Sequence, residues 1–308
     1  MDINMEELTQ RIKQDLEKKF TPENMKRIAK EMYEEDRQKP ENFSNWYPYI
    51  KKFGNFRRAE IVSNQILTFE ETEVFKKTDV ISKVNWEEIK QILKPTLDQM
   101  ENNKLYSLKN GCFSDKFNNE IAIVSKADLP EKLWKLNYDS ALLETGGFTE
   151  VVVRELIPHD YTKTPTIYNG LPLREEMRVF YNLDTKEIEY MEDYWKLDYC
   201  EESISNKTDA IVFKWFHNKL RGRHDQHTHI INVLKERIKR DINTIQFDSK
   251  LTGIWSIDFM YVTDSPKYNG LWLVDMARGE RSAYWNPARL KPETRKLLNN
   301  KNKENKNG

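Results

Sequence analysis

Apolar residues recur every three or four positions near the start of the chain, a spacing that predicts two amphipathic helices. The first helix is expected to end near Phe20, and Thr21 and Pro22 then provide an N-cap and a first-turn proline for the second. Because each helix has one apolar face, we expect both to pack against a core. The same spacing recurs at 86–100, where Pro95 predicts a kink.

Short apolar runs predict a series of strands in the rest of the chain. We expect strands at 105–109, 121–125, 151–157, 176–182, 187–194, 254–262 and 271–277. Helices are expected from Asp128 to Gly146 and Gly147, and at 209–220 and 229–245. The last ten residues, 299–308, contain no apolar side chain, which predicts a disordered tail.

The last two strands form a predicted hairpin around an Asn-Gly turn. If Val262 faces Leu271 in this hairpin, Asp258 faces Asp275 on the same side, with Cβ atoms about 4.5–5.5 Å apart. Two carboxylates this close repel each other unless positive charge lies between them. Mg²⁺ would supply that charge, and since it favours few carboxylates plus phosphate oxygens, a metal–nucleotide complex fits better than an all-protein cage. A one-residue slip in register would instead place both aspartates on opposite faces as solvated residues.

Composition narrows the classes of function. The chain has 308 residues, with 50 Lys or Arg balanced by 50 Asp or Glu. A protein that mainly binds nucleic acid or anionic membrane would carry a basic excess, so neutrality argues against both as general partners. No apolar run approaches the ~18 residues of a membrane span, the charged start has no signal-peptide core, and two cysteines make no disulfide framework. We therefore expect a globular cytoplasmic protein.

Basic residues on strands are the second candidate for chemistry. Lys109 ends a predicted strand, Lys116 lies in the following loop, and Arg154 and Arg178 lie within mainly apolar strands. Taken singly, such an arginine is more often paired with a carboxylate than with a phosphate. Fixed positive charge opposite a metal-holding acidic pair, however, is an arrangement that binds a triphosphate and stabilises a transferring phosphoryl group. No GxGxxG or GxxxxGKS/T pattern occurs, so Rossmann and P-loop sites are not expected.

The order of these motifs resembles the ATP-grasp superfamily. Lys109 on a strand is followed by a polar loop, the apolar strand ending at 153–157, the strand at 176–180 and the acidic pair on the last hairpin. Each motif is short, and their order and spacing over residues 105–285 carry the resemblance. The chain is most similar to the branch containing the eukaryotic cell-cycle ATP-grasp proteins implicated in assembling the translation initiation factor two complex, with viral and bacterial relatives.

This resemblance implies a fold class and a division of the chain. The implied fold is α+β, with two α+β subdomains that clasp a nucleotide beside a mainly helical N-terminal region. The implied parts are the N-terminal region at 1–100, a lid subdomain at 101–157, a C-terminal subdomain with the metal site at 158–298, and the tail at 299–308. ATP and Mg²⁺ are the implied cofactors.

The resemblance also implies roles for individual residues. Asp258 and Asp275 would hold Mg²⁺. The residues that would contact or orient the nucleotide are Lys109, Lys116, Arg154, Glu155, Leu156, Ile157, Glu176 and Arg178. Among these, Glu155 and Leu156 would offer backbone groups to the adenine edge. Many members of the superfamily carry Asn two residues after the second acidic ligand, where this chain has Ala277; Arg278, Glu280 and Arg281 lie close enough in sequence to substitute.

The implied activity is ligation driven by Mg-ATP, in which a carboxylate of an unidentified small-molecule or peptide acceptor is activated as an acyl phosphate. Lys109 and Arg178 would be the catalytic residues that neutralise developing charge. Ala277 keeps open a second function, that of an ATP-binding assembly or adaptor protein with little turnover. A third alternative is a nucleic-acid ligase with Lys109 as the adenylylated nucleophile, although Lys109-Asn110-Gly111 differs by one residue from the Lys-x-Asp-Gly motif.

Histidines offer a competing site. His217, His224, His227 and His229 lie close together in sequence and could bind zinc as neutral imidazoles. No cysteine lies nearby, and residues 221–227 also fit a polar loop between two helices.

Overall fold

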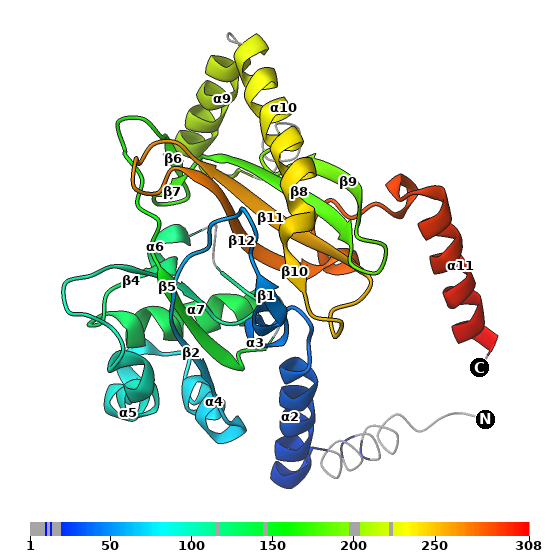
Figure 1. The fold of residues 1–308 in the computed structure, drawn as a ribbon. Helices are drawn as coiled ribbons and strands as arrows, with labels where there is room; N and C mark the ends of the chain where they lie inside the picture. Colours follow the sequence, from blue (N-terminus) through cyan, green and yellow to red (C-terminus); the bar gives the residue numbers. More distant parts are fainter. Residues whose placement is uncertain are drawn as a thin grey trace.

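Two four-stranded antiparallel sheets form the body of the molecule, and most of the helices lie against them (Figure 1). The computed structural model describes residues 10, 13, 20–114, 118–143, 147–196, 204–221 and 224–307. Its helices are α2 (Pro22–Arg37), α3 (Phe43–Trp46), α4 (Phe69–Lys76), α5 (Trp86–Leu97), α6 (Asn119–Ala122), α7 (Leu129–Leu142), α9 (Lys207–Arg221), α10 (His224–Asp241) and α11 (Pro292–Asn307). Its strands are β1 (Ile50–Lys52), β2 (Ile61–Ile66), β3 (Tyr106–Lys109), β4 (Ile123–Val124), β5 (Glu150–Glu155), β6 (Thr166–Ile167), β7 (Leu171–Pro172), β8 (Glu175–Asn182), β9 (Glu187–Asp193), β10 (Gln246–Phe247), β11 (Ile254–Val262) and β12 (Gly270–Arg278).

The first sheet, which we call the N-terminal sheet, has the order β2-β5-β3-β4. Its central strand β5 is buried on both faces, as its continuous apolar run predicts. Val151 and Val153 pack with Leu93 of α5 and Leu133 of α7, whereas Val152 points the other way and joins the core of the second sheet. The N-terminal sheet is therefore covered by helices on one face and turned toward the second sheet with the other.

The second sheet, which we call the C-terminal sheet, has the order β12-β11-β8-β9. Ile257 and Phe259 of β11 pack with Leu234 and Ile238 of α10, which crosses this sheet in Figure 1. The aromatic-rich segment after α2 completes the same core, and the rings of Phe56 and Phe259 lie 4.6 Å apart. Because side chains alternate along a strand, residues next to Ile257 and Phe259 point to the opposite face.

The predicted hairpin forms, with one residue of difference in register. Val262 faces Gly270 rather than Leu271, so the expected pairing at the turn end is wrong by one position. A bulge then adds one residue to β12 between Leu273 and Asp275, and Asp258 faces Asp275 as predicted. Such a bulge turns two successive residues to the same side of a strand. The bulge therefore places Asp275 on the same face as Asp258. With the one-residue difference at the turn and no bulge, the two side chains would lie on opposite faces.

Other predicted elements form with local differences. Helix α2 begins where expected, and the Thr21 hydroxyl caps it by accepting from the Asn24 N–H at 3.2 Å. The expectation that α2 packs against a core is wrong, because no residue of α2 is buried and Met25 and Met32 are 47% and 58% exposed. The helix contacts the body near Tyr33, whose hydroxyl donates to the Leu67 carbonyl at 2.6 Å. The preceding predicted helix falls largely outside the described residues.

Two further differences concern short segments. The strand expected at 121–125 is wrong at its start, because residues 119–122 form α6 and only Ile123–Val124 pair as β4. Ile121 is buried in the same core as Leu133, so its apolar character reflects packing of a helical turn and not of a strand. The structure also continues α11 to Asn307, where no regular structure was expected.

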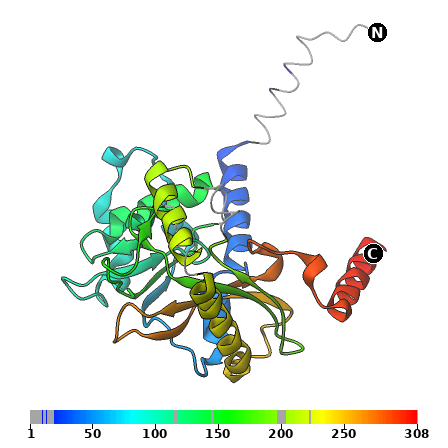
Figure 2. The ribbon, with the colours of Figure 1, turned by 90° about the horizontal axis from the view of Figure 1, so that it is seen from above.

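Helices α2 and α11 extend away from the two sheets (Figure 2). Within the part of the chain that the structure describes, no helix combines the length and apolar character that crossing a membrane requires.

Candidate functional site

Lys109 links the two sheets. It lies at the end of β3 in the N-terminal sheet, and its Nζ donates to both carboxylate oxygens of Asp275 on β12 at 2.7 Å. The Lys109 side chain is only 2% exposed, whereas that of Asp275 is 27% exposed. The predicted phosphate-binding lysine and one of the predicted metal ligands are therefore in direct contact, across the interface between the sheets.

A second ion pair lies beside the first within the C-terminal sheet. Arg178 on β8 faces Asp258 on β11 in the strand register, and its Nε and Nη2 donate to the two Asp258 oxygens at 2.8 Å each. Burial disfavours the charged guanidinium, but the Asp258 carboxylate outweighs it, so the pKa of Arg178 is raised above its ordinary value. The guanidinium also lies 4.8 Å from the centre of the Tyr194 ring. Arg178 is held as a fixed cation.

The expected repulsion between the facing aspartates is thus relieved by a lysine on one side and an arginine on the other. Among the described residues, no group of three or more His, Cys, Asp or Glu side chains is placed to hold a metal ion. Two adjacent carboxylates offer hard oxygen donors but too few for a protein-only cage, which is the donor set that suits Mg²⁺ completed by phosphate oxygens and water. Asp258 and Asp275 therefore fit the group that the resemblance implies.

Arg154 adds a third cation beside the Lys109–Asp275 pair. Its Nη1 donates to the Val274 carbonyl at 2.8 Å, directly at the bulge of β12. Its Nε is buried and has no hydrogen-bond partner among the described residues. Burial lowers the pKa of Arg154, and the Asp275 carboxylate partly offsets this. A buried N–H of a charged group without a partner is costly, so the site favours an added acceptor.

The predicted hinge residues line a cavity of about 170 Å³ between the sheets. Arg154, Glu155, Leu156, Ile157 and Glu176 all contribute to its wall. Residues that the sequence did not single out complete it: Ala59, Ser107, Ser114, Asn119, Ala122, Leu171, Pro172, Arg174, Met260, Leu273 and Val274. The cavity combines an apolar wall with a few polar groups, as small-molecule sites do.

One backbone N–H of the predicted hinge already has a hydrogen-bond partner. The Glu155 N–H donates to the Glu60 carbonyl at 2.8 Å, so it does not point at the cavity as a donor. The Glu155 carboxylate accepts from the Tyr268 hydroxyl at 2.9 Å. Lys116, the second predicted phosphate contact, lies outside the described residues.

Arg174 and Asp264 form a buried ion pair that sequence reasoning missed. Arg174 Nη2 lies 2.9 and 3.0 Å from the two Asp264 oxygens, and the side chains are 3% and 5% exposed. The Thr164 hydroxyl and the Asp160 N–H also donate to Asp264, at 2.8 and 3.2 Å. Neither residue belongs to a recognisable motif, since the pairing joins a loop before β8 to the turn of the last hairpin. Its burial and its additional hydrogen bonds indicate that this ion pair stabilises the fold. Arg174 also borders the cavity.

The polar side chains beside Ala277 are not the ones that the sequence suggested as replacements for the missing Asn. Arg278 and Glu280 pair with each other at 3.1 Å, and Arg278 also donates to the Thr252 carbonyl. The residues opposite and beside Ala277 are serines: Ser256 faces it across the strands, and the Ser256 and Ser282 hydroxyls lie 2.5 Å apart. Hydroxyl groups are therefore the polar side chains nearest to this position.

The predicted histidine site lies in a part of the chain where the structure does not describe the side chains. Helix α10 begins at His224, so the loop expected at 221–227 is wrong from that residue onwards. The side chains of His217, His224, His227 and His229 lie outside the described part of the structure.

The fold is similar to two solved structures. Cdc123 from Schizosaccharomyces pombe matches with a TM-score of 0.41 and 14% sequence identity, over 80% of this chain and 86% of that chain. A C-terminally truncated Cdc123 from the same organism matches with a TM-score of 0.42 and 13% identity, over 85% of this chain and 94% of that chain. No family profile and no curated protein sequence matches the chain.

Proposed function

We propose that the chain binds Mg-ATP in the cleft between the two sheets, as an ATP-grasp protein. The observation that carries this proposal is the meeting of Lys109 from one sheet with Asp275 and the Arg178–Asp258 pair from the other. The adenine end of the nucleotide would occupy the cavity at 154–157, and the phosphates would lie toward Lys109 and Arg178.

Charge balance supports this arrangement. The phosphate end of the cleft contains three cations, Lys109, Arg154 and Arg178, and two carboxylates, Asp258 and Asp275. ATP brings about four negative charges and Mg²⁺ two positive charges, so the loaded site would be close to neutral. The lysine and arginine would exchange carboxylate oxygens for phosphate oxygens, which leaves the carboxylates to contact the metal. Every charged side chain then keeps a partner of opposite sign.

Carboxylate ligation is the activity that this site would serve. Lys109 and Arg178 would hold the terminal phosphate of ATP in line with an acceptor carboxylate and neutralise charge that develops during transfer. Bound Mg²⁺ would supply Lewis-acid polarisation of the phosphate oxygens. Closure of the two sheets would exclude water from the acyl phosphate product before a nucleophile attacks it. The acceptor is an unidentified small molecule or peptide.

An ATP-binding adaptor with little turnover is the second candidate, and Ala277 favours it, because the second acidic ligand has no Asn two residues later. The nucleic-acid ligase alternative is less well supported. A nucleophilic lysine must be uncharged, whereas Lys109 Nζ contacts both oxygens of a carboxylate.

Nucleotide binding can be tested by thermal stability in the presence of ATP with and without Mg²⁺. We expect Mg-ATP at 100 times its Kd to stabilise the wild type by about 2.7 kcal/mol. Asp258→Asn and Asp275→Asn should remove most of this gain, whereas Asp248→Asn, which alters a surface pair with Lys51, should keep it. Absence of any Mg-dependent stabilisation of the wild type would exclude the proposal.

Turnover separates the two candidates. Protein that binds Mg-ATP would be incubated with carboxylate-containing acceptors and amines while ADP and AMP are followed. ADP formation that depends on the acceptor supports acyl-phosphate chemistry, AMP supports adenylyl transfer, and binding without either product supports the adaptor.

A further inference from the structure

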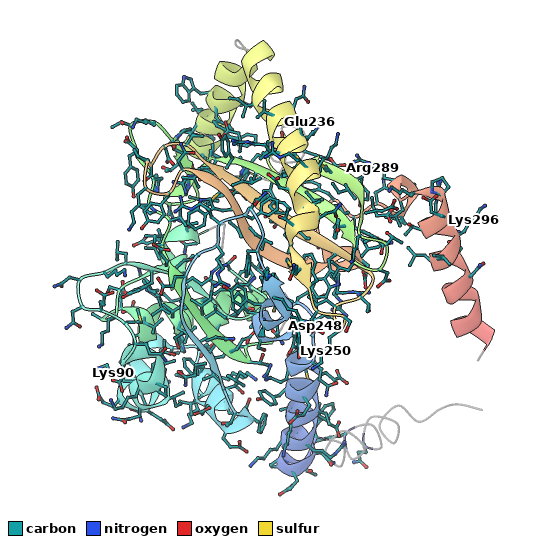
Figure 3. The ribbon with its side chains drawn as sticks, viewed as in Figure 1. Lys90, Glu236, Asp248, Lys250, Arg289 and Lys296 are labelled. Carbon is teal, nitrogen blue, oxygen red and sulfur yellow. The ribbon has the colours of Figure 1, made fainter. Side chains whose placement is uncertain are left out.

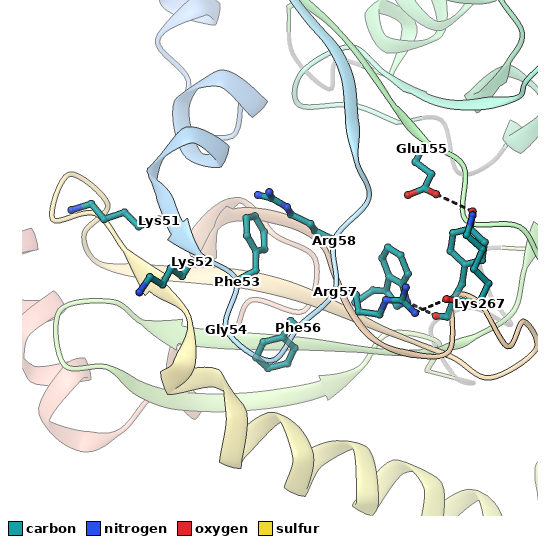
Figure 4. Close-up of a pocket in the computed structure, with 11 residues that line it drawn as sticks. Lys51, Lys52, Phe53, Gly54, Phe56, Arg57, Arg58, Glu155 and Lys267 are labelled. Atoms are coloured by element: carbon teal, nitrogen blue, oxygen red, sulfur yellow. Dashed lines mark hydrogen bonds between the residues drawn. The ribbon is translucent and has the colours of Figure 1, made fainter. Parts of the chain in front are cut away.

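A basic groove lies on the outside of the cleft, at the edge of β12 (Figure 4). Its volume is about 640 Å³. It is lined by Lys51, Lys52, Phe53, Gly54, Phe56, Arg57, Arg58, Glu155, Lys267, Tyr268 and Trp272. Lys51 and Lys52 project from one end and Lys267 from the other, with the two arginines between them (Figure 4). The groove thus presents five cations and one carboxylate in a chain whose net charge is zero.

Most of the cations in the groove have no carboxylate partner. Lys51 lies 3.0 Å from Asp248, but among the described residues no ion pair joins Lys52, Arg57, Arg58 or Lys267 to a carboxylate. Some charges elsewhere on the surface are balanced locally. Figure 3 labels Lys90 and Glu236, which pair with Glu87 and Lys239 at 2.8 Å each.

The only carboxylate in the groove is itself engaged. Glu155 accepts from the Tyr268 hydroxyl at 2.9 Å, and Tyr268 in turn accepts from Lys267 Nζ at 3.2 Å. This contact does not neutralise the remaining cations, so the groove keeps a strong positive potential.

The arginines are held in place before any partner arrives. Arg57 Nη1 donates to the Lys267 and Asn269 carbonyls at 2.8 and 2.9 Å, and its guanidinium lies 4.7 Å from the centre of the Trp272 ring. Its backbone bonds to one edge of β12 on either side of Trp272, with Arg57 N donating to the Leu271 carbonyl and Leu273 N donating to the Arg57 carbonyl. An arginine fixed in this way loses little conformational entropy when it binds an anion.

Aromatic side chains in the groove do not form a platform for nucleic-acid bases. Phe53, Phe56 and Trp272 are 9%, 5% and 2% exposed. One face of Trp272 is covered by Arg57, and one face of Phe53 by Arg58 at 4.6 Å. Single-stranded nucleic acid binds through several exposed rings on which bases stack, whereas among the aromatic residues that line this groove only Tyr268 is partly exposed. Its free groups are cationic, and carboxylates match the guanidinium and ammonium donors.

From these observations we propose that the groove docks an acidic segment of a partner polypeptide, an extended stretch with several Asp or Glu residues. The site is separate from the phosphate end of the cleft and does not depend on nucleotide binding.

The test uses the full chain and fluorescence anisotropy with a labelled ten-residue peptide that alternates Glu with Gly and Ser. A peptide of the same length with Gln in place of Glu is the control ligand. Charge reversal at Lys52 and Lys267 (Lys52→Glu with Lys267→Glu) should weaken binding of the Glu peptide by about tenfold or more. The matched control reverses two exposed lysines elsewhere, Lys30→Glu with Lys83→Glu, and should change affinity by less than about twofold.

Several outcomes would overturn the proposal. Equal affinity for the Glu and Gln peptides, or an equal loss in both double variants, would show that the groove does not select acidic segments. Tighter binding of a single-stranded oligonucleotide of equal charge would identify a nucleic-acid surface instead. Circular dichroism and the melting temperature of each variant confirm that the fold is intact, since all four lysines are exposed.

Discussion

Two buried ion pairs in this molecule differ in how exposed their carboxylates are. Arg174 and Asp264 are 3% and 5% exposed, and the Thr164 hydroxyl and Asp160 N–H add two further donors to the carboxylate. The Lys109–Asp275 pair has a buried lysine but a carboxylate that is 27% exposed. The first pair joins neighbouring loops beside one sheet, whereas the second joins the two sheets.

This difference in exposure distinguishes a pair that stabilises the fold from a pair that can bind a ligand. A charge pair in which both members are buried cannot change partner without a large cost. A pair with one accessible member can exchange its partner for a charged ligand. The buried Nε atoms of Arg154 and Arg174 both lack a partner among the described residues, so they do not distinguish the two pairs. Arg174–Asp264 is therefore best understood as a fixed anchor, and Lys109–Asp275 as a pair whose members can be shared with a nucleotide.

The largest expected effect comes from breaking the anchor. Asp264→Asn leaves Arg174 buried without a full counter-charge, and we expect the free energy of unfolding to fall by about 3–5 kcal/mol. Asp275→Asn keeps an oxygen acceptor for Lys109 at an accessible position and should cost less, about 1.5–3 kcal/mol. Urea unfolding at pH 7 measures both. A greater loss for Asp275→Asn than for Asp264→Asn would reverse the distinction drawn between the two pairs.

Low pH should weaken the Arg174–Asp264 pair in the wild-type protein. Burial disfavours the charged Asp264 carboxylate, but hydrogen bonds from Arg174 and Thr164 outweigh it, so the pKa of Asp264 is lowered from its ordinary value. A carboxyl with a lower pKa in the folded state stabilises the fold above its unfolded pKa, about 3.9, and loses this contribution as the pH falls through the folded pKa.

We therefore expect the difference in unfolding free energy between wild type and Asp264→Asn to be constant from pH 7 to about 5 and to shrink below about pH 4. Urea titrations at several pH values, with Asp248→Asn as a surface control, measure this difference. If the difference in unfolding free energy grew as the pH fell, the pKa of Asp264 would not be lowered in the folded state.

Most of the fold was predictable because periodicity is a local property. The apolar runs in β8, β9, β11 and β12 predict buried strands, and Thr21-Pro22 marks the start of α2 whatever the helix packs against. What α2 contacts was not predictable, since an amphipathic pattern does not say whether a neighbouring surface exists. The strand expected at 121–125 failed for a similar reason, because Ile121 is buried from a helical turn.

The candidate site was predictable only in part, for a different physical reason. The pairing of Asp258 with Asp275 follows from strand register, although the bulge that preserves it has no signal in sequence. The contacts between Lys109 and Asp275 and between Arg174 and Asp264 join residues 166 and 90 positions apart. Only the packing of the two sheets and of their connecting loops decides such partners.

A smaller effect is expected from removing the buried member of the exchangeable pair, Lys109. Lys109→Met should weaken Mg-ATP binding by about 1.5–3 kcal/mol, because it removes a charged donor to phosphate. Lys104→Met, an exposed lysine that pairs with Glu101, is the matched control and should leave affinity unchanged. Isothermal titration with Mg-ATP measures both variants. If Lys109→Met lowered stability but not affinity, this pair would be a structural anchor like Arg174–Asp264.

The smallest effect concerns the hairpin turn that carries Asp264. The same turn reaches the hinge through a neutral donor, the Tyr268 hydroxyl, which lies 2.9 Å from the Glu155 carboxylate. Tyr268→Phe should lower the free energy of unfolding by about 0.5–1.5 kcal/mol, because it removes a partly exposed hydrogen bond to Glu155 and an exposed one from Lys267, and leaves the ring packed near Trp272.

A double-mutant cycle with Glu155→Gln tests whether the loss belongs to this contact. If it does, the two substitutions together should cost less than the sum of their separate effects, since each removes the same charged hydrogen bond. Strict additivity would show that the hydroxyl and the carboxylate act independently. In that case the turn would be held by Asp264 and by the hydrogen bonds from Arg57 to the Lys267 and Asn269 carbonyls, without a coupled contribution from the Tyr268–Glu155 contact.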